Sequence, residues 1–173
     1  MFAMPFHPAV PVPYNITQLL QITPYFAKSN LRTTMNPRTA YSSTPLAKKL
    51  GIKEGFIVRL VNEPLYYHDL FTDMPANITF SKSKTAKKNF IHYFTEEAKQ
   101  LYKDLPSLKE EIVDNGIIWI SWPKKASKVP TDITEDTIRD FALQIGLVDI
   151  KVCAVDEVWS GLKLVIPVKD RKQ

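Results

Sequence analysis

The fold is decided by residues 90–122, which read FIHYFTEEAKQLYKDLPSLKEEIVDNGIIWISW. The runs at 90–94 and 117–122 are rich in β-forming residues and almost continuously apolar, as strands are when a parallel sheet is covered on both faces. Between them, apolar side chains spaced by four, three and four residues line one face of a helix: Leu101, Leu105, Leu108 and Ile112. Because two buried strands joined by a helix form a crossover unit, this stretch predicts an α/β sheet.

The ends of that helix follow from capping chemistry. Thr95 followed by Glu96 and Glu97 predicts the helix start, since a threonine hydroxyl caps free N–H groups and negative charge is favourable in the first turn. Pro106 lacks an N–H and is expected to kink the helix or divide it in two. The Asn-Gly pair at 115–116 is expected to end it.

Outward from this stretch, similar signals mark the other elements. Thr44 as N-cap, Pro45 at the first helical position and Gly51 after the last one predict a short helix over 46–50. Residues 56–61 predict another buried strand. Further elements are expected as a short helix at 64–71, a short strand at 77–80, an amphipathic helix that starts at an Asp132/Glu135 capping box and ends before Gly146, and strands at 148–155 and 158–166 that pair as an antiparallel hairpin.

These elements predict one domain, an open and mostly parallel α/β sheet with helices on both faces and an antiparallel hairpin at its end. We expect it to span residues 38–168, followed by a basic tail at 169–173. Residues 1–34 hold five prolines, no glycine and no acidic residue, so residues 1–37 are expected to be a loose N-terminal extension. Met35 opens a stretch of different composition, which raises the hypothesis that translation begins there.

Composition excludes several classes of protein. The chain has 173 residues, one Cys, three His and a formal net charge of +5. A single cysteine forms neither an internal disulfide nor a thiolate zinc site, so Cys153 is expected as a small buried hydrophobe and His92 as a hydrogen-bonded strand residue. No apolar run reaches the ~18–20 residues that span a bilayer. No signal-peptide pattern is present, so we expect a cytoplasmic protein without membrane contact.

Three blocks of sequence resemble a family of uncharacterised bacterial proteins catalogued as a domain of unknown function. The blocks are 41–52 (YSSTPLAKKLGI), 122–127 with 131–136 (WPKKAS and TDITED) and 146–164 (GLVDIKVCAVDEVWSGLKL). The resemblance covers residues 38–166 and implies a family without an activity. Ser43 and Lys128 depart from it, since they stand where its pattern has glycine.

The last third of the chain is also similar to the end of the class I methyltransferase fold. The resemblance implies a single three-layer, Rossmann-like sheet shortened by a strand–helix unit, and does not imply methyl transfer. In that fold the first strand leads into a glycine-rich loop that approaches the cofactor. Here the strand is followed by residues 61–65 (VNEPL), with no glycine before Gly116. We therefore expect no cofactor, S-adenosylmethionine included.

Ligands of open α/β sheets bind beyond the carboxyl ends of the strands, where loops at 62–64 and 122–125 are expected. A tryptophan ring beside two ammonium groups can hold a flat anionic ligand by stacking and charge; the alternative is that Trp122 caps the core and the lysines are solvated. The adjacent carboxylates at 156–157 suit acid–base work or form a polar turn. The candidate ligand-binding residues are Asn62, Trp122, Lys124, Lys125, Asp156, Glu157 and Trp159.

Three functions stay open at this point. The first is a non-catalytic domain that binds a small ligand or a partner protein at the rim near Trp122. The alternative is a degenerate or divergent transferase-type enzyme with the lysines and carboxylates named above around a shared pocket. A second alternative is a nucleic-acid-associated protein that uses the lysine run Lys82–Lys88. Because a charge run is usually a solvated face and no standard nucleic-acid signature occurs, nucleic acid is not the expected partner.

Overall fold

The computed structural model describes residues 44–172, so the expected extension at 1–37 lies outside the described residues. Within them, no helix has the length and apolar character needed to cross a membrane. The elements follow in the order α1 (Leu46–Leu50), β1 (Ile57–Val61), the 3-10 turn η2 (Tyr67–Leu70), β2 (Thr79–Phe80), β3 (Lys88–Phe94), α2 (Ala98–Glu111), β4 (Ile112–Pro123), the 3-10 turn η3 (Lys125–Ser127), α3 (Glu135–Gln144), β5 (Val148–Ala154), β6 (Trp159–Val165) and the 3-10 turn η4 (Val168–Asp170).

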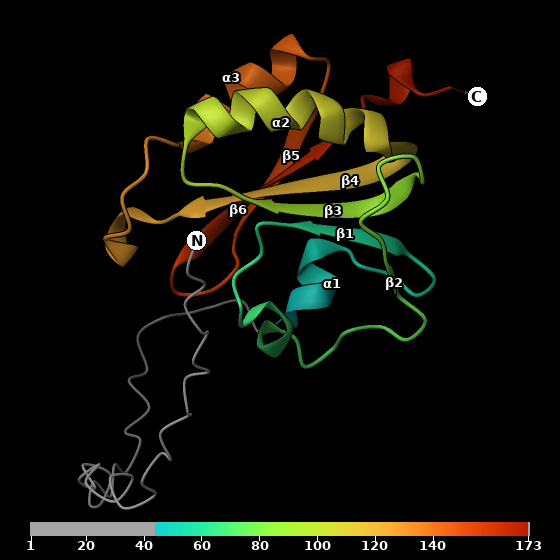
Figure 1. Cartoon of the computed structure of the whole chain (residues 1–173), viewed down its shortest axis with the longest axis horizontal. Helices are drawn as coiled ribbons and strands as arrows, with labels where there is room; N and C mark the ends of the chain where they lie inside the picture. The colour runs from blue at the N-terminus through green and yellow to red at the C-terminus, as the bar shows by residue number, and fades with distance from the viewer. Residues whose placement is uncertain (1–43, 173) are drawn as a thin grey trace, which may run out of the picture. The chain divides into compact units, whose positions relative to one another are not determined.

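The six strands form one sheet in the order β2-β1-β3-β4-β6-β5 (Figure 1). The strands β2, β1, β3 and β4 are parallel, and β6 pairs antiparallel with both β4 and β5. Helices α2 and α3 cover one face, while α1 and η2 cover the other. The prediction of a three-layer, mostly parallel open sheet that ends in an antiparallel hairpin is therefore confirmed.

Alternation along the central strands sends side chains to both sides of the sheet and gives it two apolar faces. On the α2–α3 side, the buried leucines of α2 pack with Tyr93 and Ile120. On the α1 side, Leu50 packs with Trp119, whose indole N–H donates a hydrogen bond to the Leu50 backbone oxygen at 2.8 Å. Gly51 then ends α1 in the left-handed conformation, as predicted.

The starts of α2 and α3 differ from the sequence prediction for one shared reason. The helix α2 begins at Ala98, not after Thr95, because the Oδ1 atom of Asp132 accepts a hydrogen bond from the Ala98 N–H at 2.7 Å. Asp132 therefore caps α2 and does not cap α3. The capping box of α3 is formed by Thr134 with Thr137 instead of Asp132 with Glu135. A residue that local spacing assigns to the start of α3 thus caps a helix that is distant from it in the sequence.

Pro106 lies inside α2 and does not divide it in two, so of the two predicted effects of this proline the division does not occur. Pro106 itself is exposed, whereas Leu101, Leu105 and Leu108 on the opposite face are buried against the sheet. The packing of that leucine face outweighs the missing backbone hydrogen bond, since most helix stability in a protein comes from tertiary packing.

Candidate functional site

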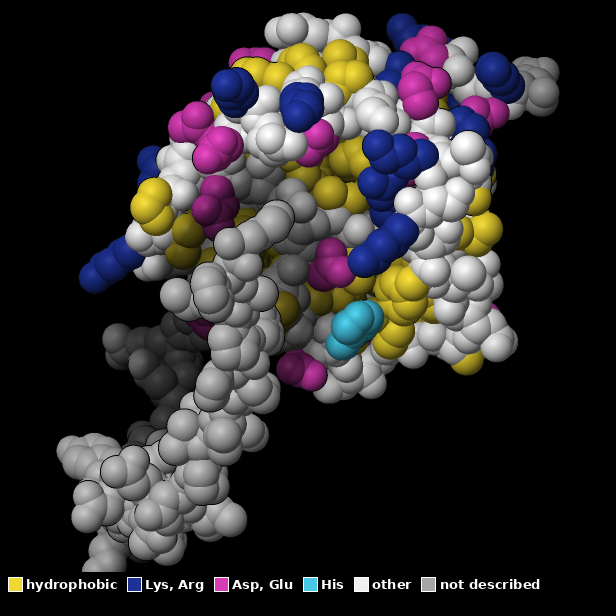
Figure 2. All heavy atoms as spheres, in the orientation of Figure 1, with side chains coloured by type: hydrophobic (Ala, Val, Ile, Leu, Met, Phe, Trp, Pro, Cys, Tyr) yellow, Lys and Arg dark blue, Asp and Glu magenta, His cyan; other side chains and the backbone are white. Residues whose placement is uncertain are grey.

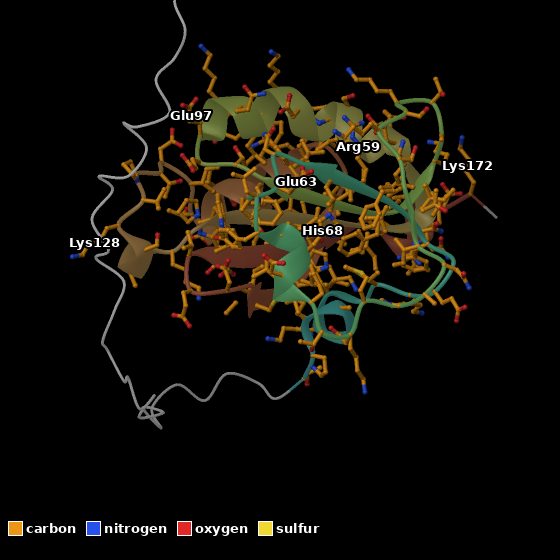
Figure 3. All side chains as sticks on the ribbon, turned by 60° about the horizontal axis from the view of Figure 1, so that its bottom comes forward. Arg59, Glu63, His68, Glu97, Lys128 and Lys172 are labelled. Atoms are coloured by element: carbon orange, nitrogen blue, oxygen red, sulfur yellow. The ribbon has the colours of Figure 1, made fainter. Side chains whose placement is uncertain are left out.

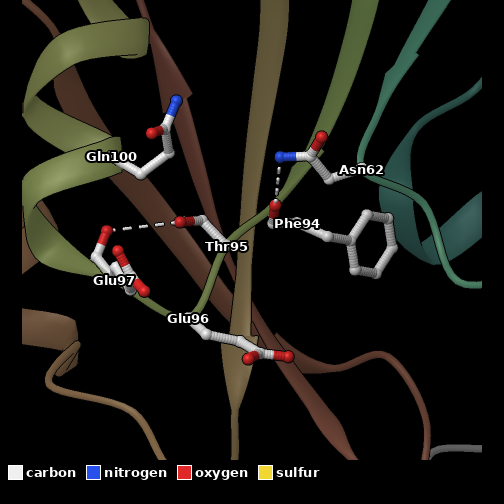
Figure 4. Close-up of a pocket in the computed structure, with 6 residues that line it drawn as sticks. All are labelled: Asn62, Phe94, Thr95, Glu96, Glu97 and Gln100. Carbon is white, nitrogen blue, oxygen red and sulfur yellow. Dashed lines mark hydrogen bonds between the residues drawn. The ribbon is translucent and has the colours of Figure 1, made fainter.

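An open pocket lies where the order of strands along the sheet reverses. The chain passes from β1 outward to β2 and returns to β3 on the other side of β1, so the carboxyl ends of β1 and β3 border a switch point. Open α/β sheets bind their ligands at such points. The pocket has a volume of about 330 Å³. Its lining, which we call the β1–β3 rim, consists of Asn62, Phe94, Thr95, Glu96, Glu97 and Gln100 (Figure 4).

Hydrogen bonds hold the backbone of the β1–β3 rim and leave its carboxylates unneutralised. Nδ2 of Asn62 donates to the Phe94 backbone oxygen at 3.3 Å and ties β1 to β3. The Glu96 backbone oxygen accepts from the Thr131 hydroxyl at 2.6 Å. Both glutamate side chains, Glu96 and Glu97, are exposed, and in the described part of the chain neither forms an ion pair. The rim therefore presents negative charge on a fixed backbone.

The β1 side of the pocket continues into a tight turn. Asn62 has a φ of 54°, in the left-handed region that asparagine tolerates better than most residues. Pro64 follows and has no N–H to offer a ligand. Figure 3 labels Glu63 in this segment and His68 in η2. From this segment, the side chain of Asn62 lines the pocket, and no glycine-rich backbone loop is present there.

A buried hydrogen-bond chain fastens η2 to the sheet next to this turn. The Tyr67 hydroxyl lies 3.1 Å from Nδ1 of His92, and Nε2 of His92 lies 2.8 Å from the Ser121 hydroxyl. All three side chains are fully buried. Burial lowers the pKa of His92 to about 3, so its imidazole is neutral near pH 7, with one nitrogen that donates and one that accepts. His92 is the hydrogen-bonded strand histidine that the sequence predicts.

The residues most favoured by the sequence lie at another part of the sheet edge, where β4 ends beside the start of β6. We call Trp122, Lys124, Asp156 and Trp159 the β4–β6 rim. Trp122 is 8% exposed and packs on the α2–α3 side. Trp159 is 9% exposed and packs on the opposite side, with its ring 5.1 Å from that of Phe94. The two indole rings therefore do not converge, and both are covered.

Hydrogen bonds inside the β4–β6 rim engage its polar groups. Oδ1 of Asp156 accepts from the N–H of Val158 at 2.8 Å and from the N–H of Trp159 at 2.6 Å. Nζ of Lys124 donates to the backbone oxygen of Asp156. These contacts close the turn between β5 and β6, so Asp156 has the polar-turn role that the sequence left as the alternative to a chemical one.

Of the seven predicted site residues, Asn62 lines the β1–β3 pocket and the other six do not. Lys125 in η3 and Glu157 in the β5–β6 turn are exposed, away from that lining. The sequence prediction missed Gln100 and assigned residues 95–97 to a helix start. The signal that points to residues 95–97 is their position directly after a continuous apolar strand, where the carboxyl-end rim of a parallel sheet must lie.

The lysine run at 82–88 divides into solvated and structural side chains. Figure 2 shows Lys and Arg side chains gathered near the start of β3. However, Lys88 is fully buried, and its Nζ donates to backbone oxygens within the run and lies 3.4 Å from Oε2 of Glu111. Nζ of Lys87 donates to a backbone oxygen of α2 at 2.5 Å. The run thus offers less free charge than its composition indicates.

Metal and thiol chemistry have no arranged site among the described residues. No three His, Cys, Asp or Glu side chains there are grouped to hold a metal ion. Cys153 is partly buried, and burial raises the pKa of its thiol, although Lys49, Lys151 and Lys124 act in the opposite direction.

Comparison with known proteins gives a family and a fold. Residues 47–168 match the family described as "Protein of unknown function (DUF3052)", in agreement with the resemblance of the three sequence blocks. No curated protein matches the sequence.

Solved structures similar to this chain include several methyltransferases. One is a SAM-dependent methyltransferase from Aquifex aeolicus, with 17% identity over 69% of this chain and 87% of that chain and a TM-score of 0.52. Another, from Sulfolobus solfataricus, is classed as a type 11 methyltransferase, with 13% identity over 74% and 93% of the two chains and a TM-score of 0.51. A third is the magnesium protoporphyrin IX methyltransferase of Synechocystis with bound SAM, with 12% identity over 70% and 74% and a TM-score of 0.47. At these identities the likeness establishes the fold.

The prediction of no cofactor is contradicted by these neighbours. It depended on the missing glycine-rich loop after β1, yet the A. aeolicus protein that shares this fold is SAM-dependent. The inference was wrong because a glycine-rich loop is only one way to approach a cofactor. Polar side chains that converge on a pocket fix a ligand as well.

Proposed function

The chain belongs to the DUF3052 family of proteins of unknown function, and we propose that it binds a small cationic ligand of the S-adenosylmethionine class in the β1–β3 pocket. The observation that carries the proposal is the pair of unneutralised carboxylates, Glu96 and Glu97, at the switch point of the sheet. The proposal retains ligand binding at the edge of the sheet, as the sequence predicted, but places the site at the β1–β3 rim with Asn62 and not at the β4–β6 rim with Trp122.

The charge of the pocket selects a cation. Among the residues that line it, the two carboxylic side chains, Glu96 and Glu97, are the acidic ones, and no Lys, Arg or His is among them. A sulfonium or ammonium group is attracted to such carboxylates, and the amides of Asn62 and Gln100 can exchange hydrogen bonds with the hydroxyl groups of a ribose. The volume of about 330 Å³ lies at the lower end of the range for small-molecule sites.

The residues fit S-adenosylmethionine through side chains and not through a backbone cradle. Glu96 and Glu97 would hold its cationic groups, and Gln100 and Asn62 its hydroxyl groups. The lining has no Lys or Arg to pair with the carboxylate of the ligand, so that end is expected to point towards solvent. When bound, S-adenosylmethionine supplies a methyl group to a nucleophile; the role proposed for this chain is to bind and orient it.

The test is calorimetric titration of the full chain with S-adenosylmethionine and with S-adenosylhomocysteine, which lacks the sulfonium charge. We expect tighter binding of the charged ligand, and a loss of about tenfold in its affinity in each of Glu96→Gln and Glu97→Gln, because a charge-assisted contact is removed.

The matched control is Glu110→Gln, since Glu110 is also exposed but lies at the far end of α2. Its affinity is expected to stay within about twofold of that of the unchanged chain. Equal affinity for both ligands, or no heat with either, contradicts the proposal.

A further inference from the structure

Four lysines lie in α1, directly after it, or on the strands β5 and β6. Lys49 lies in α1, Lys53 follows it, Lys151 is on β5 and Lys163 is on β6. In the strand register Lys151 stands directly opposite Lys163, and Lys163 directly opposite Trp119, which packs under α1. Because directly opposed residues of paired strands share a face, both β-strand lysines project towards the α1 side.

The two strand lysines reach the same turn at the end of α1. Nζ of Lys151 donates to the Lys49 backbone oxygen at 3.2 Å. A Cβ atom placed on Gly51 would lie 3.7 Å from Nζ of Lys163. The ammonium groups of two neighbouring strands therefore both lie at the end of α1, one beside Lys49 and the other beside Gly51.

No ion pair of the described residues involves these lysines. Glu54, the neighbour of Lys53 in sequence, accepts a hydrogen bond from Asn77 at 2.8 Å instead. Burial lowers the pKa of Lys163, and the charges of Lys151 and Lys53 lower it further. Like charges directly opposite each other on paired strands are unfavourable, so the bare cluster carries a repulsion that an anion would relieve.

We propose that Lys151 and Lys163, at the end of α1, form a binding site for the phosphate group of a small, compact anion. An ammonium group is a strong donor to phosphate oxygens, and a doubly charged anion shared by two lysines turns their repulsion into attraction. The site is separate from the β1–β3 pocket, which is lined by carboxylates and takes the opposite charge. It does not depend on the proposed function.

The test uses the full chain with inorganic pyrophosphate, compared with sodium chloride at equal ionic strength. Lys163→Met removes the charge of Lys163 and keeps its apolar stem. Lys151→Gln removes the opposing charge. The control is Lys82→Gln with Lys84→Gln, which removes exposed charge from the lysine run far along the chain. Calorimetry measures affinity, and thermal unfolding measures stability with and without pyrophosphate.

We expect pyrophosphate to raise the unfolding temperature of the unchanged chain above that in chloride, and its affinity to fall about tenfold in Lys163→Met and in Lys151→Gln. Without pyrophosphate, the Lys163→Met variant is expected to unfold at a higher temperature than the unchanged chain, because the repulsion between the two lysines is removed. With pyrophosphate, the variant is expected to unfold at a lower temperature than the unchanged chain, because it binds the anion more weakly. A purely structural role of Lys163 at the end of α1 gives no such reversal.

Three results would overturn the proposal. One is an equal effect of pyrophosphate and chloride at the same ionic strength. Another is an equal loss of affinity in the control variant. The third is binding of a short single-stranded oligonucleotide without binding of pyrophosphate, which would assign the lysines to a nucleic-acid backbone.

Discussion

The two rims at the edge of the sheet both contain carboxylates but leave them in opposite states. At the β4–β6 rim, the carboxylate of Asp156 accepts two backbone N–H groups of its own turn, and Lys124 donates to the backbone of the same turn. At the β1–β3 rim, the backbone of Glu96 is held by Thr131, and its carboxylate is left without an ion pair in the described residues. A carboxylate is available to a ligand when other groups supply the hydrogen bonds that fix its backbone, as at Glu96, and unavailable when it supplies them itself, as at Asp156.

The largest expected effect concerns the buried histidine next to the β1–β3 rim. The pKa of His92 is lowered to about 3 in the folded chain, against an ordinary value of 6.5, so the unfolded chain takes up the proton first. Its stabilising contribution is complete above pH 6.5 and is lost as the pH falls towards 3. Between pH 6.5 and 5 we expect it to fall by about 2 kcal/mol.

Urea unfolding of the unchanged chain and of His92→Gln across this pH range measures the difference. The variant is expected to be less stable near pH 7 and to lose stability less steeply with acid. NMR titration of His92 in the unchanged chain is the independent check. An imidazole that gains its proton near pH 6.5 in the folded protein would refute the prediction.

A smaller effect separates the structural carboxylate from its neighbour at the β4–β6 rim. Asp156→Ala removes the acceptor of two backbone hydrogen bonds, so we expect a loss of about 1–2 kcal/mol in the free energy of unfolding. Glu157→Ala, the adjacent and exposed carboxylate, is the control and is expected to change it by less than about 0.5 kcal/mol. Equal losses in the two variants, measured by urea unfolding, would mean that the turn does not depend on Asp156.

The smallest expected effect is a gain in stability in the connection that leaves the β4–β6 rim. Lys128 has a φ of 59°, a left-handed conformation that is costly for a residue with a Cβ. Lys128→Gly is expected to stabilise the chain by about 0.5–1 kcal/mol and to leave ligand binding at the β1–β3 rim unchanged. Lys125→Gly, in η3 three residues earlier, is the matched control and is expected to give no gain. A loss of stability in Lys128→Gly would contradict the inference that the left-handed backbone at Lys128 costs stability.

The sheet was predictable because its signals are local. The apolar runs at 56–61, 90–94 and 117–122 became β1, β3 and β4, and Gly51 ended α1 in the conformation that its position indicates. The resemblance also marked Lys128 as a position where glycine is expected, and the backbone there is left-handed.

The features that escaped prediction depend on contacts between distant segments. Asp132 caps α2 across 34 positions in the sequence, and this moves the helix start to Ala98 and frees Glu96 and Glu97 for the rim. Local propensity cannot reveal that exchange, because both aspartate and threonine are good caps for whichever helix is near. The switch point itself depends on strand order, which follows from pairing and not from composition.

NMR titration tests most directly whether the β1–β3 rim or the β4–β6 rim binds the ligand. In ¹⁵N-labelled full-length protein titrated with S-adenosylmethionine, we predict amide shifts at the β1–β3 rim, at Asn62, Glu96, Glu97 and Gln100, with the β4–β6 rim little changed. Shifts concentrated at Trp122, Lys124 and Asp156, or no shifts in the presence of excess ligand, would contradict this prediction.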